Sequence, residues 1–180
     1  MSLLDEVHVS VDIEACGEVL VSLGACEFNP RTGEAGREFY GVPSIKDQMG
    51  AGLKMDAGAF LWWLKQDAAT LEAVWAQQDA HEVLFRFSEW LHPDAWVWAY
   101  PTSFDLPVIE RVYRTYDLRC PWTWTKTMDG RTLWRLACDI NPELEKVERN
   151  ANPAAHNALA DAKEQAGWFA RYLNPLWMRP

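Results

Sequence analysis

Four acidic residues and one histidine have the side chains and the spacing of a centre that binds divalent cations. Asp12 and Glu14 are separated by a single residue in an apolar stretch. Asp105 follows a short aromatic stretch, and His156 precedes Asp161 by five positions. Hard divalent cations prefer carboxylate oxygens, and histidine is the side chain best suited to accept a proton near neutral pH. Such a set fits the hydrolysis of a phosphodiester bond with two bound cations.

Each of these residues alone has a more ordinary explanation. Asp12 and Glu14 would suit the solvated face of a strand, and Asp105 would suit the cap of a helix. Asp161 in a first helical turn is explained by the helix dipole, and a lone His156 before a helix is usually a surface residue. Their joint order and context favour the metal site.

The alternation of apolar and polar residues explains how the first two acids share a surface. Residues 7–14 alternate with a period of two, which predicts a strand with Asp12 and Glu14 on one face. Residues 18–28 predict a second strand, and a turn rich in Asn, Pro and Gly leads to a third near 37–40. These three strands are expected to form an antiparallel meander.

The remaining chain is expected to be mostly helical. We expect a buried strand over 96–100 and helices over 59–65, 69–77, 81–91, 106–116, 131–138 and 157–173. Segments 43–58 and 117–127 are expected to be irregular, and 139–155 a loop or a weak helix. This order predicts an α/β fold with a mixed sheet and helices on both faces.

Two helix starts carry the other site residues. Asp105 is expected just past the end of the strand over 96–100, with Pro107 in the first turn of the helix that follows. Asn157 is a plausible N-cap of the last helix. His156 would then lie on the preceding loop, from which it can lean over the site.

The composition is that of an ordinary globular protein. The 180 residues are 49% hydrophobic and 24% charged, which suits one domain over 1–180. No apolar run approaches the ~20 residues that span a bilayer, and the first residues lack a secretory pattern. The four cysteines form no Cys-x-x-Cys pair, which argues against zinc and disulfides. A cytoplasmic protein without membrane association is therefore expected.

Three segments resemble the DEDDh exonucleases of the ribonuclease H-like superfamily. Val11-Asp-Ile-Glu14 matches the first motif, Ser103-Phe-Asp105 the second, and His156-Asn-Ala-Leu-Ala-Asp161 the third. The related DEDDy enzymes place tyrosine where this chain has Asn157. A small single-domain branch, which resembles mycobacterial 3′–5′ exoribonucleases and a phage exodeoxyribonuclease, is the closer match. Its supporting features are Trp62-Trp63-x-x-Gln66 and Arg131-Thr-Leu133.

The resemblance implies a fold, a reaction and a set of roles. It implies a ribonuclease H-like sheet, two Mg²⁺ or Mn²⁺ ions, and release of nucleoside 5′-monophosphates from a 3′ end. Asp12, Glu14, Asp105 and Asp161 would bind the metal, with Glu14 also counted as catalytic. His156 would be the general base.

Five further positions are candidates for contacts with the substrate. They are Ala15, Trp63, Gln66, Phe104 and Arg131. Many relatives carry threonine at the place of Ala15, so only its backbone remains for the terminal nucleotide. Packing is favoured for Trp62, whereas Trp63 is taken as a base-stacking aromatic. Gln66 would also suit a solvated helix, and Arg131 would bind a phosphate or pair with a neighbouring acid.

The net charge of the chain limits the kinds of nucleic acid that are expected as substrates. A formal net charge of −9 argues against tight binding to long duplexes, although bound cations reverse the charge locally. A single-stranded 3′ end or overhang, of RNA or DNA, is the expected partner, and tryptophan-rich surfaces would suit a homodimer. Two alternatives are a ribonuclease H-type endonuclease on hybrids and a non-catalytic interaction module. The spacing of His156 and Asp161 disfavours the first, and the intact acidic set disfavours the second.

Overall fold

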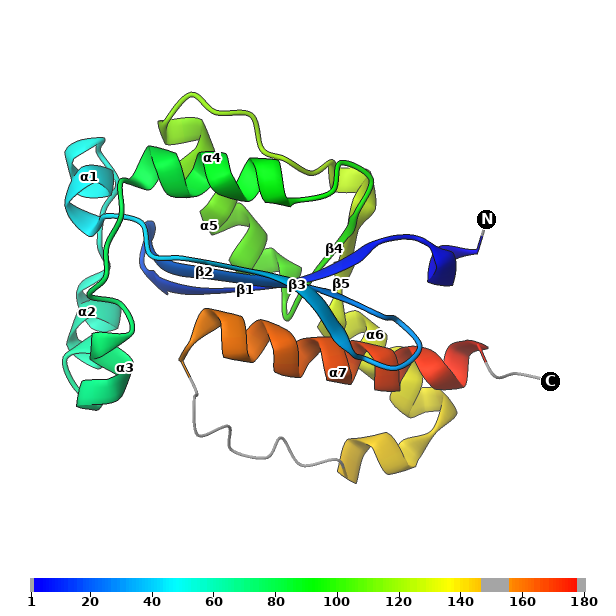
Figure 1. Cartoon of the computed structure of the whole chain (residues 1–180). Coiled ribbons are helices and arrows are strands. Elements are labelled where there is room, and N and C mark those ends of the chain that lie inside the picture. The colour runs from blue at the N-terminus through cyan, green and yellow to red at the C-terminus, as the bar shows by residue number, and fades with distance from the viewer. Residues whose placement is uncertain (1, 147–155, 178–180) are drawn as a thin grey trace.

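A mixed sheet forms the centre of the computed structural model, which describes residues 2–146 and 156–177 (Figure 1). Its strands are β1 (His8–Cys16), β2 (Val19–Phe28), β3 (Ala35–Gly41), β4 (Trp96–Ala99) and β5 (Thr127–Asp129). They lie in the order β3-β2-β1-β4-β5. The first three are antiparallel neighbours, as the sequence predicts, and β4 and β5 run parallel to β1.

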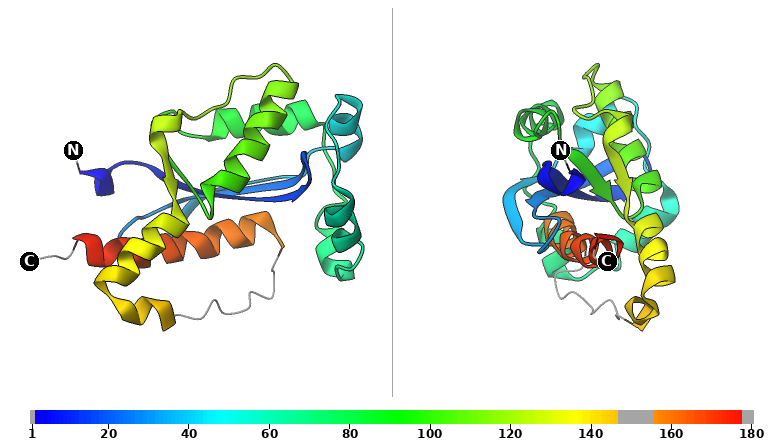
Figure 2. Two further views of the ribbon diagram at one scale, coloured as in Figure 1. Left: turned by 180° about the vertical axis from the view of Figure 1, so that it is seen from behind. Right: turned by 90° about the vertical axis from the view of Figure 1, so that its right-hand side faces the viewer.

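Helices cover both faces of this sheet. They are α1 (Ile45–Gly50), α2 (Ala57–Trp63), α3 (Ala68–Glu72), α4 (Ala80–Trp90), α5 (Thr102–Thr115), α6 (Gly130–Ile140) and α7 (Ala158–Trp177). Short 3-10 helices lie at Leu3–Asp5, Trp124–Lys126 and Pro142–Lys146. Helices α4 and α5 lie on one face and α6 and α7 on the other, with α1 to α3 beyond the strand ends at the turn between β1 and β2 (Figures 1 and 2). The predicted α/β class is confirmed, and the topology is consistent with a ribonuclease H-like fold. Within the described ranges, no helix has the length and apolar character to cross a bilayer.

The two faces of β1 are chemically different. Val9, Val11 and Ile13 are buried in the core that α4 and α5 complete, and each such side chain contributes ~1.5–3 kcal/mol of transfer free energy. The alternate residues, which include Asp12 and Glu14, face α7. The period-two pattern therefore predicted correctly that both acids share one face.

Helix α5 begins at Thr102, four residues before the predicted start. The side chain of Asp129 accepts hydrogen bonds from the backbone N–H and the hydroxyl of Thr102, at 2.9 and 3.0 Å. It also caps α6 by accepting from the N–H of Thr132 at 2.8 Å. Asp105 therefore lies inside the first turn of α5, and Pro107 lies beyond that turn.

Two short elements lie in segments that were expected to be irregular. Helix α1 occupies part of 43–58, where Ser44 caps it and the buried Gln48 bonds to the backbone of Leu20. Strand β5 begins at the end of 117–127 and pairs with β4. The stretch 139–155 is described only as far as Lys146. Its first two residues are the end of α6, and a 3-10 helix follows at Pro142–Lys146. The rest of that stretch lies outside the described residues.

Candidate active site

Three carboxylates meet where β1 faces the start of α7. Asp12 and Glu14 come from β1, and Asp161 comes from the first turns of α7. Each offers an oxygen, and these three oxygens all lie within 4.8 Å of one another. Three anionic oxygens this close repel one another strongly unless a cation or protons lie between them.

Asp105, in the first turn of α5, is the fourth acid of this centre. Its side chain is 3% exposed and accepts hydrogen bonds from its own backbone N–H and from that of Ile13. Its Oδ2 atom is buried and has no hydrogen-bond partner among the described residues. Asp105 stands outside the three-oxygen group, but its charge raises the pKa of both Asp12 and Glu14.

Burial and mutual repulsion disfavour the charged forms of these acids. Burial raises the pKa of Glu14 to about 8, and the charges of Asp161 and Asp105 add to the effect. Burial likewise raises the pKa of Asp105 to about 7, opposed by its backbone hydrogen bonds and by the charge of Arg131. The pKa of Asp12 is raised well above its usual value, first by burial and then by the other three acids. Clustered acids with raised pKa values mark a functional site.

His156 lies on the loop before α7, as predicted. Asn157 caps the helix, because its side-chain oxygen accepts from the N–H of Ala160 at 3.0 Å. The backbone of His156 has a positive φ of 69°, which a residue other than glycine seldom adopts. Its N–H donates to Asp161 Oδ2 at 3.0 Å, and its Nδ1 lies 3.8 Å from Glu14 Oε1. The imidazole thus faces the acidic centre while 44% of its side chain stays exposed.

The family described as the Rv2179c-like 3′-5′ exoribonuclease domain matches residues 7–173. The chain belongs to this family. Its match covers every residue of the acidic centre, and it confirms the branch that the motifs resemble. A comparison with curated proteins returns no match.

Within this Rv2179c-like domain, the two adjacent tryptophans have exposures opposite to those expected. Trp63 is 7% exposed, packs with Cys16 and Val21, and donates from its indole N–H to the Ala15 carbonyl oxygen at 3.1 Å. Trp62 is 40% exposed, and its ring centroid lies 4.7 Å from that of His156 in an edge-to-face contact. The assignment of Trp63 as a base-stacking residue is therefore wrong, because the face of α2 that meets the sheet carries Trp63.

The other candidates for substrate contacts differ in their exposure and in the hydrogen bonds that they already make. The carbonyl oxygen of Ala15 is engaged by the indole described above. The side-chain amide of Gln66 donates to the backbone oxygen of Trp62 at 3.0 Å and so closes the end of α2. Phe104 stands exposed in the first turn of α5. Arg131 is exposed at the start of α6, stacks on the Tyr100 ring at 5.6 Å, and acts electrostatically on Asp105.

Gln165 is a site residue that the motifs did not identify. It lies one helical turn after Asp161 and is 6% exposed. Its side-chain N–H donates to Asp12 Oδ1 at 2.6 Å. The spacing of four residues on a helix places Gln165 beside Asp161, and this signal was available in the sequence.

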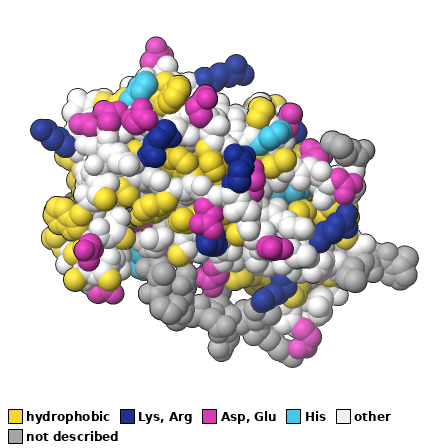
Figure 3. All heavy atoms as spheres, in the orientation of Figure 1, with side chains coloured by type: hydrophobic (Ala, Val, Ile, Leu, Met, Phe, Trp, Pro, Cys, Tyr) yellow, Lys and Arg dark blue, Asp and Glu magenta, His cyan; other side chains and the backbone are white. Residues whose placement is uncertain are grey.

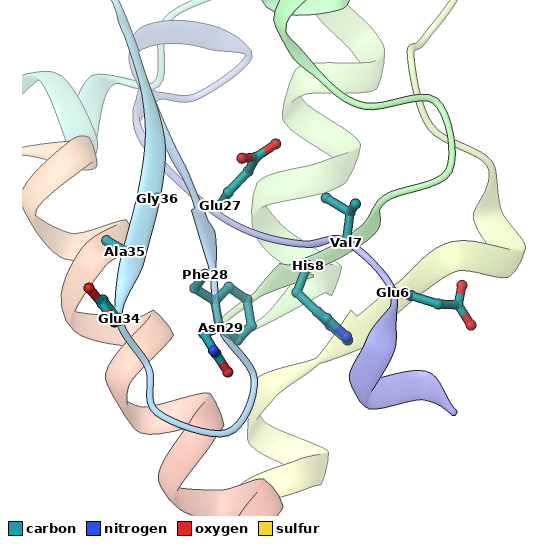
Figure 4. Close-up of a pocket in the computed structure, with 9 residues that line it drawn as sticks. All are labelled: Glu6, Val7, His8, Glu27, Phe28, Asn29, Glu34, Ala35 and Gly36. Atoms are coloured by element: carbon teal, nitrogen blue, oxygen red, sulfur yellow. The ribbon is translucent and has the colours of Figure 1, made fainter. Parts of the chain in front are cut away.

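A hollow lies at the other end of β1, around Glu6, His8 and Glu27 (Figure 4). The indole N–H of Trp98 donates to His8 Nδ1 at 2.9 Å, so Nε2 carries the proton and donates to the Leu3 carbonyl oxygen. Burial lowers the pKa of His8, which stays neutral. Glu6 and Glu27 bond to other side chains. This histidine is therefore a packed structural residue, far from the acidic centre.

Proposed function

We propose that this chain is a metal-dependent 3′–5′ exonuclease of the DEDDh type, with His156 as general base. The observation that carries the proposal is the convergence of three carboxylate oxygens within 4.8 Å of one another, from Asp12, Glu14 and Asp161. A histidine at the rim of that cluster, 3.8 Å from Glu14, supplies the proton acceptor that hydrolysis requires.

The residues present fit divalent cations. All the candidate ligand atoms are carboxylate oxygens, which Mg²⁺ and Mn²⁺ prefer. The buried Oδ2 of Asp105 lacks a hydrogen-bond partner within the described ranges, as a ligand atom does before its ion binds. We assign Asp12, Glu14, Asp105 and Asp161 as the residues that hold the metal. Two bound ions would supply charge stabilisation for the attacking and leaving oxygens.

The residues of the chain itself have separate tasks. His156 accepts the proton of the attacking water, and its exposed ring can pass that proton to solvent. Glu14, whose Oε1 lies 3.8 Å from Nδ1, orients the ring. The hydrogen bond from the His156 N–H to Asp161 holds the backbone of His156 against the start of α7, so the base and this metal ligand keep a constant spacing.

The substrate we propose is a single-stranded 3′ end or a 3′ overhang, shortened by one nucleoside 5′-monophosphate at a time. The description of the family names an exoribonuclease, which favours RNA. Trp62 of α2 and Phe104 of α5 are exposed aromatic side chains, and aromatic faces bind bases without sequence preference. Arg131 is the proposed phosphate contact.

One set of substrates tests this function. Labelled single-stranded RNA, single-stranded DNA and 3′-overhang duplexes of matched sequence are incubated with Mg²⁺ or Mn²⁺. We expect a ladder that shortens from the 3′ end, and mononucleotides in the supernatant. Asp12→Asn should abolish this activity, whereas Asp94→Asn, at an exposed acid far along the chain, should keep it. Internal cuts in a substrate with a blocked 3′ end would refute the proposal.

A further inference from the structure

The start of α7 rests on the sheet at a single glycine. Gly24 lies in β2 directly opposite Asp12 of β1 on one side and Tyr40 of β3 on the other. Residues that pair directly across strands project to the same face of a sheet. A side chain at position 24 would therefore point to the face that carries Asp12 and is covered by α7.

That side chain would have no room. An ideal Cβ on Gly24 would lie 2.1 Å from the carbonyl carbon of Ala158, 2.1 Å from the nitrogen of Leu159 and 2.3 Å from the oxygen of Ala158. All three atoms belong to the backbone of the first turn of α7, which cannot yield by changing a rotamer. Any residue other than glycine must push the start of the helix away from the sheet.

From Gly24 toward the C-terminal end of β2, the side chains on this face become larger. Gly24 offers no side chain, and the Cys26 thiol donates to the Ala162 carbonyl oxygen at a sulfur–oxygen distance of 3.7 Å. Phe28 packs its ring 6.0 Å from that of Phe169, centroid to centroid. This series lets the helix lie closest to the sheet at its N-terminus, where α7 and β1 face one another (Figure 1).

The start of the helix carries two of the site residues as one unit. Ala158 is fully buried between His156 and Asp161. The His156 N–H is bound to the Asp161 carboxylate, and the Asp161 N–H is bound to the backbone oxygen of Asn157. A shift of this turn therefore moves the histidine and the acid together, relative to Asp12 on the strand below.

We propose that Gly24 is a positioning residue, which sets the distance between the N-terminus of α7 and β1 and so brings His156 and Asp161 within reach of Asp12 and Glu14. The inference rests on the proposed function for its link to catalysis. Its structural part, the assembly of the cation site, stands without any assay of hydrolysis. Alanine is otherwise acceptable in a strand interior, where glycine is the weaker choice, so harm from Gly24→Ala would come from the close approach.

The test is Gly24→Ala, with Gly36→Ala as the matched control. Position 36 lies in β3, where a Cβ would make only ordinary contacts, the nearest at 3.4 Å from the Glu27 Cβ. Mn²⁺ affinity is measured by calorimetry without substrate and by the electron paramagnetic resonance signal of bound Mn²⁺. We expect Gly24→Ala to weaken Mn²⁺ binding about ten-fold or more and to lower kcat about a hundred-fold with a smaller change in KM. Gly36→Ala should match the wild type in every measurement.

Ala158→Val provides a second approach from the helix side, because added methyl groups at this buried position also lift the first turn. It should weaken Mn²⁺ binding in the same direction as Gly24→Ala. Wild-type Mn²⁺ affinity and kcat in a folded Gly24→Ala protein would overturn the proposal. It also fails if neither variant folds, because the contact would then set the fold and not the site. Wild-type protein that binds Mn²⁺ but degrades no nucleic acid would refute the proposed function and leave the calorimetric test of Gly24 valid.

Discussion

The side-chain amide of Gln165 donates a hydrogen bond of 2.6 Å to Asp12 Oδ1 and so links the last helix to the first strand. This bond opposes the rise in the pKa of Asp12, which burial and the neighbouring acids produce. It also restrains one oxygen of that carboxylate and so the orientation of the whole group. A buried partner of this kind determines how a metal ligand points.

Replacing Gln165 by leucine should therefore weaken the cation site more than the fold. We expect Gln165→Leu to lower Mn²⁺ affinity or kcat about 10- to 100-fold, the usual effect of losing such a partner. The matched control is Gln48→Leu, which removes another buried amide, bonded to the backbone of Leu20. That control should lower the thermal midpoint and leave Mn²⁺ affinity unchanged. Equal losses of affinity in both variants would show that Gln165 acts only through stability.

Removal of the imidazole should separate proton transfer from metal binding. His156→Ala is expected to reduce turnover by roughly 10²–10⁴-fold, the range for general acid–base groups. Mn²⁺ affinity should survive, because the carboxylates of Asp12, Glu14 and Asp161 remain. His81→Ala, at an exposed position on α4, serves as the control for loss of a histidine. A collapse of Mn²⁺ affinity in His156→Ala would mean that the histidine is a ligand.

Local sequence patterns were sufficient to predict most of the elements that position the acidic residues. The alternation around Asp12 and Glu14 depends only on the two faces of a strand, and the cap at Asn157 depends only on its own helix. The start of α5 was predicted four residues late because Asp129, a distant residue, holds Thr102. Strand β5 was missed because three residues have too short a pattern to indicate a strand.

The exposure of the tryptophans depended on tertiary packing. Two adjacent residues of a helix point about 100° apart, so the sequence of α2 requires that they differ but does not decide which one is buried. Trp63 is the buried one because it packs against Cys16 and Val21. Gly24 gives no periodic signal at all, since its role lies in the approach of a helix more than 130 positions later in the chain.

The two tryptophans should respond differently to truncation. Trp62→Ala is expected to raise KM at least about five-fold, the lower limit for a stacking contact of ~1–3 kcal/mol, with little change in the thermal midpoint. Trp63→Ala should instead cost roughly 3–5 kcal/mol of unfolding free energy, because the side chain is buried and bonded to Ala15. Kinetics on short single-stranded RNA and thermal unfolding separate the two effects. An unchanged KM in Trp62→Ala would exclude stacking by that residue.

Helix α2 and residues that follow α2 and α3 also form an exposed apolar surface around Trp62. Figure 3 shows hydrophobic side chains gathered over this end of the molecule. The exposed members are Phe60, Leu61, Trp62, Leu64 and Trp75. Leu61→Ala therefore provides a control for the loss of exposed apolar area away from the His156 ring, and we expect it to keep the wild-type KM.

The stability of the metal-free protein should fall as the pH rises from about 5 to about 8. The pKa of Glu14 is raised from 4.5 to about 8 and that of Asp105 from 3.8 to about 7, in each case mainly by burial. Between the unfolded and folded values the folded state binds more protons than the unfolded state, so a rise in pH favours unfolding. The stabilising contribution of these two groups is complete below about pH 4 and lost above about pH 8.

Thermal unfolding in a chelator, measured across this pH range, tests whether the stability falls as the pH rises. Glu14→Gln and Asp105→Asn cannot ionise and should each reduce the pH slope of the midpoint, whereas Glu72→Gln, at an exposed position of α3, should keep it. Mn²⁺ replaces the protons as the partner of the carboxylates, so it should raise the midpoint most at high pH. For a chain of this size each kcal/mol corresponds to about 2–4 °C. The midpoints of the metal-free wild type and of Glu14→Gln are compared from pH 5 to pH 8. If the wild-type midpoint rises more steeply than that of the variant, the raised pKa of Glu14 is contradicted.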